Sequence, residues 1–302
     1  MTPFIHSFAS ALGEPASICG LPQLVDDPLL AEYLTSSGLA HYLQSAASPP
    51  ELAAHALRAT LELAELDPRQ IDVVVWGSTS FQNRAWYCAD VSRALGDVGL
   101  WTATPIGVTL SECGNLIAVL RVAAGLVAAG HANVLVVVTD CAASPEQRLV
   151  PPSVAVLSDG AAACVVSADP RGFEIRAIRQ VTNHRARQTV DDQAVRVMRH
   201  NAEGMRRATN AVLAATGVDP AAIKCVVTNN LARPVLEMFA AQARVDYARV
   251  FRDHVADYGH VFASDGLINL AAIPSAQDDC ILLATNGTCN WGAALLRRTE
   301  GD

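Results

Sequence analysis

Cys113 is the side chain in this sequence with the clearest capacity for covalent chemistry. It lies between a β-branched, apolar stretch and the apolar run 116–129, whose composition and length predict a helix. A thiol at a strand-to-helix turn is exposed to the positive end of the helix dipole, which favours the thiolate and therefore nucleophilic attack. The alternative is a small buried hydrophobic residue, which is the usual role of a free cysteine.

The other cysteines do not suggest a metal or redox site. The chain has eight cysteines, which are scattered, and none forms a C-x-x-C pair. Structural zinc sites and thioredoxin-like redox sites depend on such close pairs. We therefore expect no metal and no cofactor, and we expect most of these cysteines to be core residues.

Composition and charge narrow the class of protein. The chain has 302 residues, of which 51% are hydrophobic and 17% charged, as in a globular protein with a large core. The formal net charge is −8, so the basic surface that nucleic-acid binding requires is not indicated. Neither a membrane-spanning run nor a signal peptide is evident, so we expect a cytoplasmic protein with no membrane contact.

A short cluster of arginines stands out against this acidic background. It comprises Arg176, Arg179, Arg185 and Arg187. A solvated surface is the simplest interpretation of the cluster. The alternative is a surface that meets an acidic carrier protein or a phosphate group.

The elements that position Cys113 follow from the hydrophobic pattern, which predicts helices alternating with apolar strands in an order that occurs twice. The first series has helices at 50–66, 86–95 and 116–129 and strands at 71–76, 103–108, 134–139, 154–156 and 161–166, the last two paired around Asp159-Gly160. The second has strands at 173–178, 223–228, 280–284 and 291–296 and helices at 191–215, 234–243 and 267–273. We therefore expect an α/β fold whose sheets are covered on both faces, although the pattern also fits a single doubly wound sheet.

Three segments make the chain resemble a known superfamily. They are the residues around Cys113, the turn 158–161, and the run 286–296, which reads Asn-Gly-Thr-Cys-Asn-Trp-Gly-Ala-Ala-Leu-Leu. From about residue 50 to the C-terminus the chain is similar to the thiolase superfamily, and in particular to 3-oxoacyl-[acyl-carrier-protein] synthase III. The resemblance implies a homodimer and a five-layered αβαβα fold made of two similar halves. These would be 1–168, which carries the nucleophilic cysteine, and 169–302, which carries the other catalytic residues.

The resemblance also implies a catalytic histidine and a catalytic asparagine, and this chain has the two residue types exchanged. Where the family has a His-Gln-Ala-Asn run after a strand, the run 229–232 reads Asn-Asn-Leu-Ala. Where the family has an asparagine after a glycine, the chain has His260. By resemblance the catalytic residues are therefore Cys113, His260 and Asn229, with Asn230 in place of Asn229 if the register shifts by one.

This exchange bears on the reaction. A cysteine nucleophile takes an acyl group from a thioester, while backbone N–H groups, by resemblance those of Cys113 and Gly287, hold the oxyanion. The family's condensing enzymes use histidine and asparagine together to stabilise the enolate that forms when malonyl loses carbon dioxide. Asn229 can donate a hydrogen bond but cannot take up a proton, whereas His260 can act as a general base towards a hydroxyl or amine. We therefore expect an acyltransferase of specialised (polyketide or related) metabolism with a small-molecule heteroatom acceptor.

Two alternatives remain open at this point. One is a decarboxylative or non-decarboxylative Claisen condensing enzyme of the synthase III type, and the other is a non-catalytic partner subunit of an active homologue.

The donor is an acyl-carrier protein or acyl-CoA; the segment 26–50 lacks the tryptophan and arginine with which family members hold coenzyme A, which favours the carrier protein. Glu112 is interpreted as a helix-start carboxylate or a dimer contact, and Asp257 as a loop residue or an orienting partner of His260.

Overall fold

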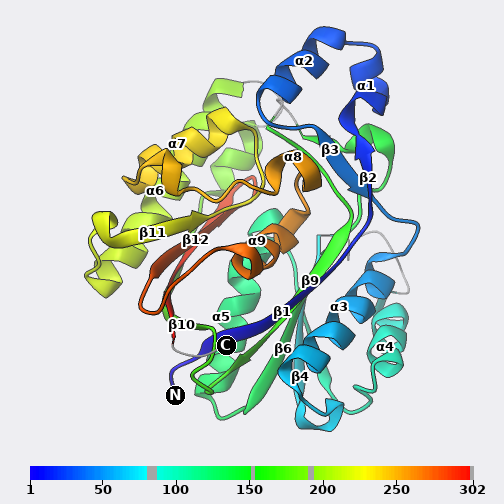
Figure 1. Ribbon diagram of the computed structural model, residues 1–302, viewed down its shortest axis with the longest axis vertical. Helices are drawn as coiled ribbons and strands as arrows, with labels where there is room; N and C mark the ends of the chain where they lie inside the picture. Colours follow the sequence, from blue (N-terminus) through cyan, green and yellow to red (C-terminus); the bar gives the residue numbers. More distant parts are fainter. Residues whose placement is uncertain (80–86, 151–153, 190–193, 300–302) are drawn as a thin grey trace.

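The computed structural model describes residues 1–79, 87–150, 154–189 and 194–299 (Figure 1). Within them, nine strands follow one another in one hydrogen-bonded order. In that order they are β11 (Ile223–Val227), β12 (Cys280–Asn286), β13 (Asn290–Arg298), β10 (Phe173–Thr182), β1 (Phe4–Leu12), β9 (Gly160–Ser167), β6 (Asn133–Asp140), β4 (Val73–Gly77) and β5 (Thr104–Val108).

This order consists of two similar half-sheets that meet at β1 and β10. Two residue pairs join these strands, Phe4 with Glu174 and Ile5 with Phe173. In the first half-sheet β4 and β6 are parallel, whereas β6, β9 and β1 are antiparallel neighbours. The second half-sheet repeats this pattern, with β11 parallel to β12 and with β12, β13 and β10 antiparallel. Because β9 ends at Ser167 and β10 begins at Phe173, we keep the division into 1–168 and 169–302 as a proposal.

Helices cover both faces of each half-sheet and complete five layers (Figure 1). Helices α3 (Pro49–Ala64) and α4 (Tyr87–Asp97) pack outside the first half-sheet, and α6 (Ala194–Thr216) and α7 (Arg233–Ala243) pack outside the second. Helices α5 (Asn115–Ala128) and α9 (Asp265–Ala272) lie between the two half-sheets and share one buried cluster. Every residue of β4 and of β9 is buried, as expected for strands covered on both faces. The predicted α/β architecture of two covered half-sheets is therefore confirmed.

One predicted strand pairing is wrong. The strand β8 (Ala155–Val156) pairs with β7 (Leu149–Val150) instead of with β9, whose neighbours are β1 and β6. The physical reason lies in Asp159, whose carboxylate is buried and forms an ion pair with Arg148 at 2.7 Å. An Asp-Gly hairpin turn would place that carboxylate in solvent, whereas here it anchors a chain crossing inside the protein.

The segment 14–44, between β1 and α3, forms a cap of its own at one end of the molecule (Figure 1). The strands β2 (Glu14–Ser17) and β3 (His41–Gln44) pair there, and α1 (Pro22–Val25) and α2 (Pro28–Ser36) lie between them in the sequence. The predicted helices 86–95 and 191–215 begin outside the described residues, and their described parts are α4 and α6. No helix in the described ranges combines the length and the apolar character that crossing a bilayer needs.

Candidate active site

Cys113 lies in the 3-10 turn Glu112–Gly114, which leads directly into α5. The thiol is half-buried, and it lies directly before α5, one of the two helices between the half-sheets. The first helical side chain, Asn115, supports the turn because its Oδ1 accepts a hydrogen bond from the Ser111 amide at 3.1 Å. Cys113 therefore lies at the beginning of the central helix, as predicted.

His260 follows α8 (Val255–Tyr258), and its backbone is fixed by the segment around β8. Its amide donates to Val156 O at 2.8 Å, and its carbonyl accepts from the Ser158 amide at 2.9 Å. The preceding Gly259 has a φ of +60°, and a Cβ there would lie 2.9 Å from both Val156 O and Ser158 Oγ. Only glycine can adopt this φ so close to the neighbouring atoms. The backbone before His260 is therefore fixed, and with it the direction in which the imidazole leaves the chain.

Cys113, His260 and a third residue, Asp265, form one continuous chain of contacts. The His260 Nε2 atom lies 3.1 Å from Cys113 Sγ, and Nδ1 lies 2.5 Å from Asp265 Oδ2. The Asp265 carboxylate is fully buried and also accepts from the amides of Val261 at 2.7 Å and Asn230 at 2.8 Å. Because a carboxylate opposite Nδ1 holds a proton on that nitrogen, Nε2 is left to exchange a proton with the thiol.

The charges on either side of His260 favour the protonated form of its imidazole. Burial by itself lowers the pKa of His260, but negative charge on Cys113 and Asp265, together with hydrogen bonds to both, raises it well above its ordinary value. An imidazolium beside Sγ stabilises the thiolate form of the nucleophile. The resting site is therefore suited to nucleophilic attack on a thioester.

The side chains of the two asparagines that the resemblance implied bond to the segments that support the site. The Asn229 side chain is buried; its Nδ2 donates to Phe262 O at 3.2 Å, and its Oδ1 accepts from the Asn286 amide at 3.1 Å. The Asn230 Oδ1 accepts from Asn269 Nδ2 at 2.9 Å. Among the contacts of the described residues, neither asparagine side chain bonds to the thiol. Both tie together the loops that carry the site.

Gly287, the second amide of the implied oxyanion hole, lies against the nucleophile loop. A Cβ at this position would lie 2.5 Å from Ser111 O, so the position admits only glycine. Its N–H, however, donates to Asn290 O at 2.7 Å across the turn between β12 and β13. In this conformation the Gly287 N–H is already engaged within the turn. We therefore keep Gly287 as a proposed oxyanion donor on the condition that this hydrogen bond breaks and the turn opens.

Sequence reasoning missed Asp265 as the partner of His260. Its neighbourhood, an acidic residue at the start of an apolar helix, is common at helix N-termini and carried no signal of catalysis. Asp257, the orienting residue considered from the sequence, has a side chain that is 72% exposed and lies 4.0 Å from His41. His260 was therefore a candidate from the sequence, whereas Asp265, which contacts its Nδ1 atom, was not.

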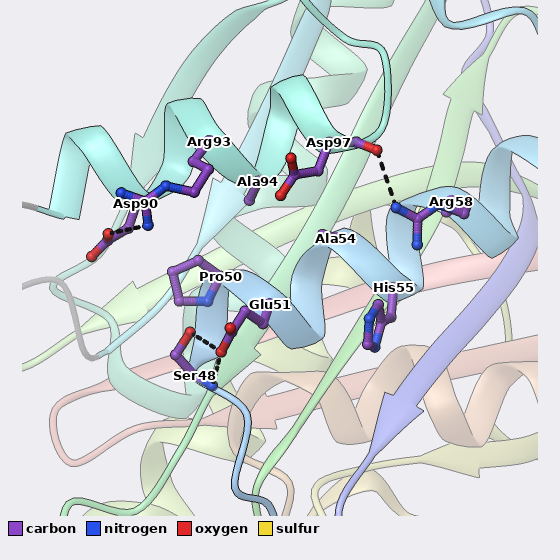
Figure 2. Close-up of a pocket in the computed structure, with 10 residues that line it drawn as sticks. All are labelled: Ser48, Pro50, Glu51, Ala54, His55, Arg58, Asp90, Arg93, Ala94 and Asp97. Carbon is purple, nitrogen blue, oxygen red and sulfur yellow. Dashed lines mark hydrogen bonds and ion pairs between the residues drawn. The ribbon is translucent and has the colours of Figure 1, made fainter.

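A separate hollow lies between α3 and α4, away from Cys113 (Figure 2). It has a volume of about 440 Å³ and is lined by Ser48, Pro50, Glu51, Ala54, His55, Arg58, Asp90, Arg93, Ala94 and Asp97. Two of its arginines have partners within the hollow: Arg58 donates to the backbone carbonyl of Asp97 at 3.1 Å, and Arg93 pairs with Asp90 at 3.3 Å. We assign this hollow no part in the chemistry.

Known proteins share both this fold and part of this sequence. No family model matches the chain. It is 25% identical over 291 residues to the beta-ketoacyl-[acyl-carrier-protein] synthase III of Chlamydia caviae, an alignment that covers 84% of this chain and 85% of that protein. Its structure is similar to that of 3-oxoacyl-[acyl-carrier-protein] synthase III from Aquifex aeolicus, with a TM-score of 0.83, 21% identity, and coverage of 98% and 99%. It is also similar to the acyltransferase ChlB3, with a TM-score of 0.82, 18% identity, and coverage of 99% and 98%.

The fold is that of the thiolase superfamily. In sequence and in structure the chain resembles 3-oxoacyl-[acyl-carrier-protein] synthase III.

Proposed function

We propose that the protein is a synthase III-like acyltransferase that passes an acyl group from a thioester donor, through Cys113, to a hydroxyl or amine of a small molecule. The observation that carries the proposal is the chain from Cys113 Sγ through the His260 ring to Asp265, with contacts of 3.1 and 2.5 Å. A nucleophile, an imidazole and a buried carboxylate in this order form an arrangement that moves one proton in each half of an acyl transfer.

The first half-reaction loads the enzyme. The Cys113 thiolate attacks the thioester carbonyl carbon, a new carbon–sulfur bond forms, and the bond to the donor sulfur breaks. The proton on His260 Nε2, 3.1 Å from Sγ, is placed to pass to the departing thiolate. The products are an acyl-Cys113 thioester, a free donor thiol and a neutral imidazole.

The second half-reaction uses the change in charge that acylation causes. The acylated sulfur is neutral, so one of the two negative charges that raise the pKa of His260 is gone. The neutral Nε2 can then accept the proton of an acceptor O–H or N–H as that atom attacks the acyl carbon. Asp265 stabilises the resulting imidazolium, and collapse of the intermediate returns the Cys113 thiolate.

Condensation is the competing function, and the contacts of Asn229 disfavour it. Stabilising an enolate calls for two side-chain donors, whereas the Asn229 side chain bonds to Phe262 and Asn286. Loss of one oxyanion donor typically costs about 3 kcal/mol, or on the order of a hundredfold in rate. A non-catalytic partner subunit is less well supported still, because such a subunit does not require a thiol, an imidazole and a carboxylate in contact, as Cys113, His260 and Asp265 are.

The donor and the assembly belong to the same proposal. A carrier-protein donor is supported by Arg176, Arg179, Arg185 and Arg187, which are all exposed in a protein of net charge −8 and could meet an acidic carrier. A homodimer is supported by β5, which ends the strand order and has a largely exposed edge. Unpaired edge strands are surfaces on which a second copy can continue a sheet.

Malonyl-carrier protein labelled in its free carboxyl group distinguishes transfer from decarboxylative condensation. Given to the acylated enzyme, it should release no carbon dioxide above the background of Cys113→Ala and yield no 3-oxoacyl product. A condensing synthase III assayed in parallel provides the positive control. Stoichiometric release of carbon dioxide with a 3-oxoacyl product would overturn heteroatom transfer and restore the condensing alternative.

A further inference from the structure

The loop that ends at the nucleophile has an uncommon backbone. Leu110 has a φ of +72° and Glu112 a φ of +52°, in the left-handed region that residues with side chains rarely adopt. Such conformations persist at functional sites where surrounding contacts hold them. The Leu110 side chain is 77% exposed, so its own packing does not hold the loop. An anchor must come from elsewhere.

The Glu112 side chain supplies contacts of the required kind. Its Oε2 accepts from the Thr288 amide at 2.6 Å and from Thr288 Oγ1 at 2.5 Å, and its other oxygen pairs with Arg187. Arg187 in turn donates to Thr288 Oγ1 at 3.2 Å. The carboxylate is thus directed at the turn between β12 and β13, 176 residues further along the chain, and at Arg187.

The same turn fits closely against the loop. A Cβ on Gly287 would lie 2.5 Å from Ser111 O and 3.2 Å from Glu112 Cβ. A turn in such close contact cannot move without displacing the loop, and the carboxylate bonds keep the two together. Cys113 follows Glu112 directly, so the position of Sγ depends on this joint.

We propose that Glu112 is a positioning residue, which fixes the nucleophile loop through Thr288 and Arg187 so that Cys113 Sγ lies within reach of His260 Nε2. The inference rests on the proposed function, in which these two atoms are the reacting pair. Among the residues that the structure describes, the charged and titratable groups that face the loop are His260, with Asp265 behind it, and Arg187. Cys289 and His184, in contact at 3.9 Å, lie beside the same turn.

The pH dependence of Cys113 alkylation by iodoacetamide separates positioning from simple charge. The reagent needs the thiolate, which displaces iodide, and it needs neither an acyl donor nor an acceptor. If Glu112 acted only through its charge, removing it would favour the thiolate and lower the midpoint in both Glu112→Ala and Glu112→Gln. If it positions the loop, Glu112→Ala raises the midpoint because the thiol loses its alignment with His260. Glu112→Gln does not raise the midpoint, because the glutamine side chain keeps an oxygen that accepts hydrogen bonds from Thr288.

We expect the midpoint to rise by about one pH unit in Glu112→Ala, so that at a pH well below both midpoints the reaction is about tenfold slower. Glu237→Ala, at a remote surface ion pair with Arg233, is the matched control and should behave as the wild type. An unchanged or lowered midpoint in Glu112→Ala, or an equal rise in Glu112→Gln, overturns the proposal.

Thr288→Val serves if Glu112→Ala does not fold. This variant removes one of the two Thr288 donors, so a smaller rise in the midpoint is expected, and no rise overturns the proposal. Because alkylation does not require acyl transfer, the positioning role and the proposed function can fail separately. Normal alkylation results with no transfer of any acyl group would refute only the function.

Discussion

Cys113→Ala is expected to abolish acylation by thioesters, with the rate falling by more than about 10⁴-fold. The thiolate is the attacking group and no neighbouring atom can replace it, whereas the loss of volume at a half-buried site leaves the fold intact. Intact-mass measurement after incubation with an acyl N-acetylcysteamine thioester reports the adduct directly, and peptide mapping assigns it to a residue.

Cys289→Ala is the matched control for this experiment. Cys289 lies in the turn beside the site, but burial raises its pKa, as does the nearby Glu112 charge, which keeps its thiol protonated. This variant should acquire the adduct at the wild-type rate. An adduct that persists in Cys113→Ala, or that maps to Cys289, would show that the nucleophile has been assigned to the wrong residue.

His260→Gln is expected to slow acylation by about 10³-fold or more. Glutamine fills much of the same space, yet it can carry neither the positive charge that stabilises the thiolate nor the proton that the leaving thiol needs. Stopped-flow measurement of thiol release from the donor, at saturating donor concentration, gives this rate without requiring an acceptor.

A second histidine close by gives this prediction its control. His254 bonds to Asn269 Oδ1 at 2.9 Å and stacks on Tyr258, so it lies in the same region and is partly buried, but it does not contact the thiol as His260 does. His254→Gln should retain acylation within about threefold of the wild-type rate. Equal losses in the two variants would mean that the loops need their histidines for structure, and the catalytic role of His260 would be withdrawn.

The sequence predicted the architecture because the fold depends on features that are local. Fully apolar strands such as β4 alternate with amphipathic helices in both halves, and this alternation by itself requires sheets covered on two faces. The predicted hairpin at Asp159-Gly160 was wrong for a reason that the local sequence pattern does not show. Its carboxylate pairs with Arg148, and this buried ion pair overrides the hairpin preference of the dipeptide.

The site was predictable only in part, for a related reason. Cys113 and His260 occupy positions whose neighbours resemble a known family, so motif and chemistry agreed. The contact of Asp265 with His260 and the contact of Glu112 with Thr288 depend on how separate segments pack, which residue spacing in the sequence does not indicate. Asn229 shows the converse, because it stands at a family catalytic position but its side chain bonds to backbone groups instead.

A single-turnover chase of the acyl-enzyme tests the central claim most directly. The enzyme is loaded with a radiolabelled acyl group at Cys113, freed of donor, and offered hydroxylamine as a nitrogen and oxygen nucleophile. The proposed mechanism predicts that the folded acyl-enzyme yields the hydroxamate at least about a hundredfold faster than the denatured acyl-enzyme at the same pH, and that His260→Gln removes this acceleration. A folded acyl-enzyme that reacts no faster than its denatured form would contradict acyl transfer through His260 to a heteroatom acceptor.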